Sequence, residues 1–214
     1  MSDSSRAGPL DTNAPKPALL AEHVLELEAF VQSVRVLCDR TVTLAAPIET
    51  LRTLRAQVDA LSAALSPHCG SRPLPLWAPP RADDLGAMLP YTSVCGRLNP
   101  QAPPVEMSVE GDGVVGRVRF TDAYEGPPRA VHGGWVAAVH DQVLALAAFQ
   151  RGFGGPTASL TIQYRSMTPI HQDVSFVARV ERTEGRKAWV TGASHAGDTL
   201  LSEAEALFIR RPPR

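Results

Sequence analysis

An aspartate stands in the middle of the most apolar helical segment of the sequence. Asp141 lies within residues 134–150, and its neighbours one helical turn away are all alanine or leucine, so no charged residue on the helix can neutralise it. Burying an unpaired carboxylate costs several kcal/mol unless tertiary groups satisfy it. Two interpretations follow: a carboxylate that performs chemistry, or one that lies at a solvated rim or beside a distant arginine.

The residues before this helix favour the chemical interpretation. His132-Gly133-Gly134 opens the helix after the turn-rich run at 124–128. Two glycines let the backbone come close to a ligand, and the free N–H groups of a helix N-terminus bind negative charge. Donors of this kind can stabilise an oxyanion that develops on a carbonyl group. The pattern therefore predicts polarisation of a carbonyl, chiefly by the N–H of Gly134 together with Gly133, and attack assisted by Asp141.

Two periodicities divide the sequence into a helical half and a strand half. Apolar residues recur every three or four positions in 18–38 and 47–65, which predicts two amphipathic helices. From about Val105 the period is two, and consecutive strands with one polar face indicate an antiparallel sheet. The predicted strands are 114–120, 160–164, 174–181, 186–194 and 199–209. The fold class is α+β, an antiparallel sheet packed on one central helix, with an N-terminal helical extension.

Clusters of proline mark the boundaries between these parts. The predicted organisation is a disordered tail at 1–17, a helical hairpin at 18–66, a proline-rich linker at 67–88 and one folded domain at 89–214. The hairpin is expected to dock on another part of the protein, because each of its helices has one apolar face.

Composition excludes several classes of partner. Lys plus Arg is 21 and Asp plus Glu is 22, so the net charge is −1, and this balance predicts binding to neither nucleic acid nor membrane. The N-terminus lacks the apolar core of a signal peptide. Cys38, Cys69 and Cys95 form no CxxC pair, and no histidine spacing resembles a metal site, so we expect a cytoplasmic protein without a metal.

Three segments resemble a known family. GPPRAVHGGWVAAVHDQVLALAAF, GGPTASLTIQYRSMTPI and EGRKAWVTGA are similar to the hotdog-fold acyl-CoA thioesterases of the PaaI-like family, especially the branch that includes mammalian members acting on long-chain acyl-CoA. The resemblance covers roughly residues 89–209. It implies a hotdog fold for the domain at 89–214 and hydrolysis of an acyl-CoA thioester, in which CoA is part of the substrate and no separate cofactor is needed.

The resemblance also implies roles for individual residues. Asp141, nine positions after His132, corresponds to the catalytic acidic residue, and Thr157 corresponds to the threonine that assists it. His132 either positions the loop or donates to the thioester, with a structural role equally open. The residues implied in contact with the CoA portion are Gln163, Arg165, Arg186 and Lys187. The sequence departs from the family pattern at two positions, with Arg129 in place of a common glycine and His140 in place of an apolar residue.

Helix geometry adds a prediction about assembly. Gly133 and Asp141 are eight residues apart, about 12 Å along one helix, so they cannot both touch one carbonyl group. The site is therefore expected to combine the loop of one subunit with the aspartate of another. A homodimer is the predicted minimal active unit, and a homotetramer is a further assembly compatible with it.

Two other functions remain open on the sequence. A hotdog hydratase or dehydratase acts on the β-carbon of an acyl-CoA and pairs a histidine with a carboxylate in a different motif. A non-catalytic acyl-CoA-binding protein would keep the fold alone. The choice between Asp141 as general base and Asp141 as nucleophile is also open.

Overall fold

The computed structural model describes residues 21–78 and 81–210, so the tail predicted at 1–17 lies outside the described residues. Helices α1 (Ala21–Val42) and α2 (Ile48–Leu65) come first, followed by the short 3-10 helices η1 (Ser66–His68) and η2 (Gly86–Met88) in the predicted linker. The remaining elements are β1 (Glu106–Glu110), β2 (Gly113–Arg119), η3 (Asp122–Tyr124), α3 (Gly133–Gln150), β3 (Thr157–Tyr164), β4 (Asp173–Glu184), β5 (Lys187–Ala196) and β6 (Thr199–Ile209).

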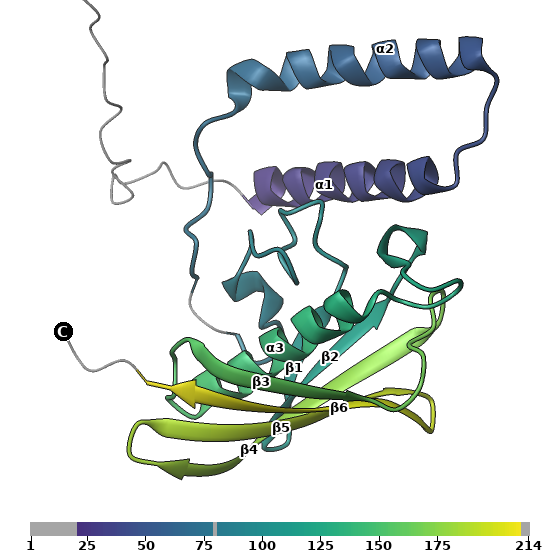
Figure 1. The fold of residues 1–214 in the computed structure, drawn as a ribbon. Coiled ribbons are helices and arrows are strands. Elements are labelled where there is room, and N and C mark those ends of the chain that lie inside the picture. The colour runs from purple at the N-terminus through teal and green to yellow at the C-terminus, as the bar shows by residue number, and fades with distance from the viewer. Residues whose placement is uncertain (1–20, 79–80, 211–214) are drawn as a thin grey trace, which may run out of the picture.

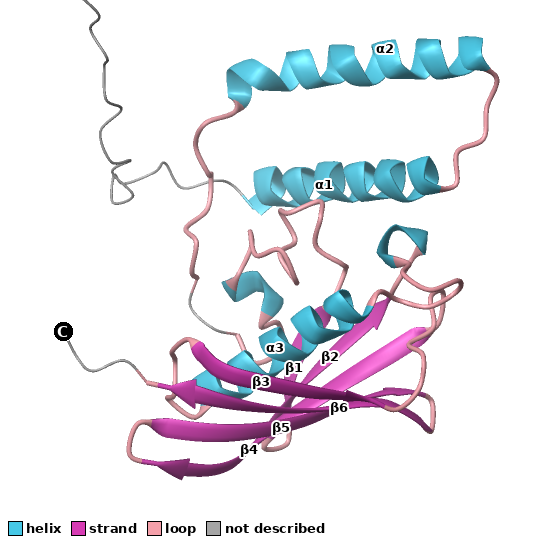
Figure 2. Ribbon diagram, viewed as in Figure 1, coloured by secondary structure: helices cyan, strands magenta, loops and turns pink. Residues whose placement is uncertain are grey.

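The six strands form one antiparallel sheet in the order β1-β2-β4-β5-β6-β3. Figure 2 shows the sheet as one layer with α3 lying across one of its faces. The hydrophobic core lies between them, and its largest buried side chains include Phe120, Phe176, Phe208 and Leu144. The predicted α+β hotdog architecture, an antiparallel sheet around one central helix, is confirmed.

Alternation along each strand explains why one face of the sheet meets α3. In β4 the side chains of Val174, Phe176 and Ala178 are buried, whereas the residues between them are half-buried or exposed. The strand β3 is different because it lies at the edge of the sheet and pairs only with β6. Among the described residues, its outer row of backbone groups has no partner strand, which leaves it available to another chain.

The two N-terminal helices differ in how they meet the domain. Val31 of α1 is buried, and the Arg35 guanidinium donates to the backbone carbonyls of Gly96 at 2.7 Å and Asn99 at 2.9 Å. No residue of α2 is buried. In Figure 1, α2 lies beyond α1 on the side away from the sheet. Helix α1 therefore docks on the domain, as predicted for the hairpin, whereas α2 keeps its apolar residues exposed.

Candidate active site

The structure brings Asp141 and Thr157 into direct contact. Thr157 begins β3, and its Oγ1 donates a hydrogen bond of 2.7 Å to Asp141 Oδ1 across the 16 residues that separate them in sequence. In the described part of the chain, Asp141 has no lysine or arginine partner, and its second oxygen, Oδ2, accepts no hydrogen bond. The threonine hydroxyl thus orients the carboxylate and leaves one oxygen open for chemistry.

Asp141 lies on a half-buried stripe of α3. The sequence of this helix is apolar on all sides, yet Ala138, Asp141, Gln142, Ala145 and Phe149 keep part of their surface exposed. The opposite side of the helix is buried against the sheet. Because the stripe is not covered by the sheet, the carboxylate avoids the full cost of desolvation. Asp141 is thus partly exposed, and its partner is the hydroxyl of Thr157 and not a distant arginine.

The start of α3 is built around His132. This residue is the N-cap of the helix, and its Nδ1 accepts a hydrogen bond of 3.0 Å from the backbone N–H of Gly134. The N–H of Gly133 donates to no other described group. Gly134 was expected to be the main polarising donor, but in the structure its N–H is bonded to the His132 side chain. Gly133 supplies the free donor at the positive end of the helix.

Tyr164 connects the other end of β3 to the same loop. Its hydroxyl donates a hydrogen bond of 2.8 Å to the carbonyl oxygen of Gly133. A Cβ atom on Gly133 would lie 3.3 Å from that hydroxyl oxygen, so the tyrosine packs closely on the glycine. Gln163 and Arg165 on either side were expected to contact CoA, but no role was expected for Tyr164. Its alternation with Leu160 and Ile162 on the helix-facing side of β3 was the available signal.

The loop before the helix is tightly folded. A Cβ atom at Gly126 would approach the Cα of His132 to 2.7 Å, so this position requires glycine. Arg129 has a φ of 62°, in the left-handed region that favours glycine. Its backbone N–H donates to the side chain of Glu125. Arg129 therefore holds, at a cost in strain, a backbone conformation that glycine adopts more easily.

The four residues expected to contact CoA do not converge within one chain. Gln163 and Arg165 lie near the N-terminus of α3, where the Arg165 guanidinium pairs with Glu203 at 2.7 Å and also contacts Gln163. Arg186 and Lys187 lie at the β4–β5 turn. Along β6, Gln163 pairs opposite residue 203 and Lys187 opposite residue 209, a separation of about 20 Å. One chain therefore presents two separate pairs of candidate CoA contacts.

The side chain of His140 contacts a different strand from that of Asp141. Its side chain is only 1% exposed, and its Nε2 shares a hydrogen bond of 2.8 Å with Ser202 Oγ, which in turn lies 2.6 Å from Ser194 Oγ. Burial lowers the pKa of His140 to about 4, so the ring is neutral at pH 7. His140, which stands where the family commonly has an apolar residue, is thus a hydrogen-bonded residue of the core between α3 and the sheet.

Three further features of the described residues concern Cys95, metal binding and membrane spans. Burial raises the pKa of the Cys95 thiol to about 11, which keeps it protonated and a poor nucleophile. The described ranges contain no cluster of three His, Cys, Asp or Glu side chains that could hold a metal ion. No described helix is both long and apolar enough to cross a membrane.

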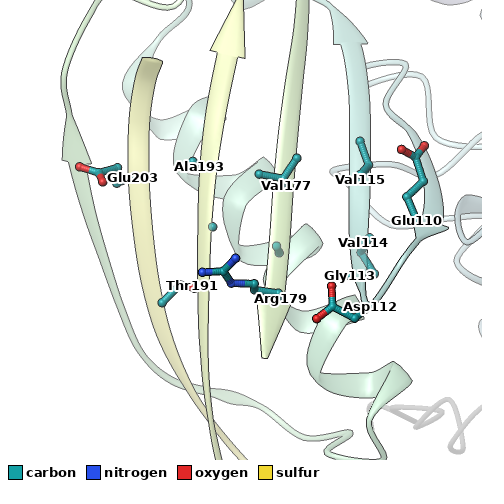
Figure 3. Close-up of a pocket in the computed structure, with 12 residues that line it drawn as sticks. Glu110, Asp112, Gly113, Val114, Val115, Val177, Arg179, Thr191, Ala193 and Glu203 are labelled. Atoms are coloured by element: carbon teal, nitrogen blue, oxygen red, sulfur yellow. The ribbon is translucent and has the colours of Figure 1, made fainter. Parts of the chain in front are cut away.

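The outer face of the sheet carries a shallow depression of about 440 Å³ (Figure 3). Among the residues that line it are Val115, Val177, Arg179, Thr191 and Glu203. None of the predicted catalytic residues lines this depression, and α3 lies behind the strands that form it. The depression is therefore separate from the Asp141–Thr157 pair.

The comparisons with known proteins agree with this geometry. Residues 129–203 match the family model described as "Thioesterase superfamily", and they include His132, Gly133, Asp141 and Thr157. The chain is thus similar to this family over these 75 residues, which make up about a third of its length. A crystal structure described as a thioesterase superfamily protein has the same fold, with a TM-score of 0.74 and 24% identity over 92% of this chain and 97% of that one.

Two curated relatives are similar over a shorter stretch. The chain is 37% identical over 91 residues to "Acyl-coenzyme A thioesterase THEM4" of Xenopus laevis, and 30% identical over 88 residues to "Acyl-coenzyme A thioesterase THEM5" of Homo sapiens. These matches cover 42% and 40% of this chain, and they span only 41% and 36% of the relatives' own length. The helices α1 and α2 and the linker lie outside the matched family region.

Proposed function

We propose that the protein hydrolyses the thioester of an acyl-CoA. The observation that carries this proposal is the 2.7 Å hydrogen bond by which Thr157 orients Asp141, in a domain whose central helix begins with a free Gly133 N–H. Both curated relatives are named acyl-coenzyme A thioesterases, which supports the same substrate class here. Thioester hydrolysis needs an oxyanion donor and a base or nucleophile, and these residues supply both.

Asp141 has two routes to the product. As a general base, Oδ2 takes a proton from water, the resulting hydroxide attacks the carbonyl carbon, and the C–S bond breaks to release CoA as its thiol after proton return. As a nucleophile, the carboxylate displaces CoA and forms an anhydride, which water then cleaves. A single turnover in ¹⁸O-labelled water detects an anhydride that water cleaves at the aspartyl carbonyl, because label then enters the Asp141 side chain and the acid product is unlabelled.

A single chain cannot place the donor and the carboxylate on one carbonyl group. The helix α3 is continuous from Gly133 to Gln150, so Gly133 and Asp141 are about 12 Å apart along its axis. We therefore propose that two chains share each site. The half-buried stripe that carries Asp141 supports this arrangement, because a second chain would cover it.

The edge strand β3 offers the surface for that pairing. Thr157 at one end of β3 bonds Asp141, and Tyr164 at the other end bonds Gly133. If two copies of β3 pair antiparallel about a two-fold axis near the middle of the strand, Thr157 of one chain comes near the partner's Tyr164. This pairing carries Asp141 toward the partner's Gly133. It makes two equivalent sites in a homodimer, and a tetramer can form from two such dimers.

The same pairing unites the candidate CoA contacts. Gln163 and Arg165 of one chain come near the end of the sheet that bears the partner's Arg186 and the partner's Lys187, so we propose that each CoA contacts both chains. We also propose a reducing, cytoplasmic setting. Three free cysteines, Cys38 and Cys69 exposed and Cys95 buried, support this compartment.

The first test is release of free CoA thiol from an acyl-CoA series, followed with a thiol reagent. We expect turnover by the wild-type protein for at least one acyl chain. Loss of enoyl absorbance on an enoyl-CoA, without thiol release, would replace the proposal with a hydratase. Binding of acyl-CoA with neither reaction would make the protein a binding module.

The shared site is tested by complementation between two inactive chains. Gly133→Pro removes the free N–H and is compatible with the start of the helix, because proline is favoured at the first helical position and His132 already has a φ of −59° and a ψ of 129°, which a following proline tolerates. Gly133→Ala is the matched control, since it adds a Cβ atom against Tyr164 but keeps the N–H. Mixing Gly133→Pro with Asp141→Asn should restore about one quarter of wild-type activity if chains exchange at random. Verified mixed dimers without activity would reject the shared site.

A further inference from the structure

A cavity of about 510 Å³ lies beside the Asp141–Thr157 pair. Its wall begins with Gln142 and Pro156, the chain neighbours of these two residues, and continues along α3 to Phe149. The other wall comes from the predicted linker, through Trp77 and Met88. These linker residues lie outside the matched family region at 129–203, so the family match does not describe this wall.

The chemistry of the cavity suits an alkyl chain. Met88 and Leu146, which form part of its lining, are almost completely buried in the core. Gln142 contributes the single side-chain amide, at the end next to Asp141. The volume falls within the range of about 300–1,000 Å³ that is typical of small-molecule sites, which are lined mainly by apolar side chains.

The backbone around Trp77 is fastened in place over this cavity. On one side, the N–H of Leu74 donates to the Tyr91 hydroxyl at 2.9 Å, and on the other, the N–H of Ala78 donates to the Met88 carbonyl at 3.0 Å. The Trp77 ring lies 6.5 Å from the Phe149 ring, between centroids, and is 64% exposed. A large ring that is fixed by its backbone but poorly buried by its own domain has surface left for a ligand.

We propose that Trp77 and Phe149 clamp the acyl chain of the substrate and make the protein selective for chains of about eight carbons or more. This inference rests on the proposed thioester hydrolysis. From Gln142 to Phe149 the cavity follows seven residues of α3, about 10 Å. A zigzag chain with C–C bonds of about 1.5 Å advances roughly 1.3 Å per carbon, so about eight carbons span this distance. Shorter chains do not reach the two rings.

The test is a series of acyl-CoA substrates from two to sixteen carbons, assayed with three forms of the protein. Trp77→Ala should lower kcat/KM about tenfold for chains of ten carbons or more, mainly through a higher KM, and less than twofold for acetyl-CoA. Leu76→Ala is the matched control, because Leu76 is the adjacent linker residue, is 48% exposed and does not line the cavity. It should leave the chain-length profile unchanged.

A second variant works in the opposite direction. Ala145→Phe fills the cavity from α3 and should shift the preference toward short chains. An equal loss at every chain length in both variants, or no loss in either, would overturn the clamp and leave the proposed hydrolysis standing.

A binding measurement keeps the two proposals separable. If the wild-type protein hydrolyses no acyl-CoA, the proposed function fails, and hexadecyl-CoA thioether then tests the clamp alone. The clamp predicts a blue shift of tryptophan emission on binding this thioether, and Trp77→Phe should remove it. Emission that does not change in the wild-type protein would overturn the clamp.

Discussion

His140 and Asp141 are neighbours in sequence, but they belong to two different regions of α3. His140 faces the sheet, where Ser202 satisfies its Nε2 and the Phe176 ring packs on it at 4.9 Å between centroids. Asp141 faces the half-buried stripe, where Thr157 satisfies one carboxylate oxygen and the other is open. The comparison shows that a polar residue in an apolar helix is structural when its side chain is buried and its polar atoms are hydrogen-bonded. It is a candidate for chemistry when one of its atoms stays open beside a cavity.

The first prediction concerns the open side of the helix. Asp141→Asn keeps an oxygen that can accept from Thr157, so the fold should persist, whereas turnover should fall on the order of 10²–10⁴-fold because the base is lost. The measurement is thiol release under saturating acyl-CoA. His140→Gln serves as the matched control on the adjacent residue and should stay within a few-fold of wild-type turnover. A folded Asp141→Asn protein with near-wild-type activity would reverse the roles assigned to the two faces.

The second prediction concerns His140, on the side of α3 that is buried against the sheet. The pKa of His140 is about 4 in the folded protein and about 6.5 in the unfolded chain, so between these values the unfolded state binds more protons. The contribution of neutral His140 to the free energy of unfolding is therefore fully present above pH 6.5. It is lost as the pH falls, by about 3 kcal/mol at pH 4. Urea unfolding at pH 7, 5.5 and 4.5 should show a steeper decline for the wild type than for His140→Gln. Parallel curves would mean that burial does not suppress protonation of His140.

Much of the fold follows from the sequence. The strand predicted at 199–209 has the observed bounds of β6, and the helix predicted at 134–150 differs from α3 by one residue, because alternation and helical period reflect burial directly. The hairpin at 18–66 is harder. Both helices are amphipathic, but only α1 has the Arg35 contacts to distant carbonyls that fix its place, and no local pattern encodes such contacts.

For the candidate site, the sequence predicted which residues to consider better than it predicted their hydrogen bonds. The resemblance paired Asp141 with Thr157, and the structure shows them in contact. It could not show that His132 uses the N–H of Gly134, because that depends on the side-chain rotamer at the helix cap. The role of Trp77 was equally hidden, since a tryptophan in a proline-rich segment acquires a partner such as Phe149 only through tertiary folding.

The smallest expected effect is the loss of the hydrogen bond from Thr157 of β3 to Asp141 of α3. Thr157 makes one hydrogen bond to the Asp141 carboxylate, so Thr157→Ala should cost roughly 1.5–3 kcal/mol in kcat/KM, less than Asp141→Asn. Thr157→Ser retains the hydroxyl and should recover most of this loss, which separates the hydrogen bond from the packing of the methyl group. Steady-state assays of the two variants side by side give the comparison. If Thr157→Ala were as damaging as Asp141→Asn, orientation of the carboxylate would be as important as its presence, and one hydrogen bond would not account for that.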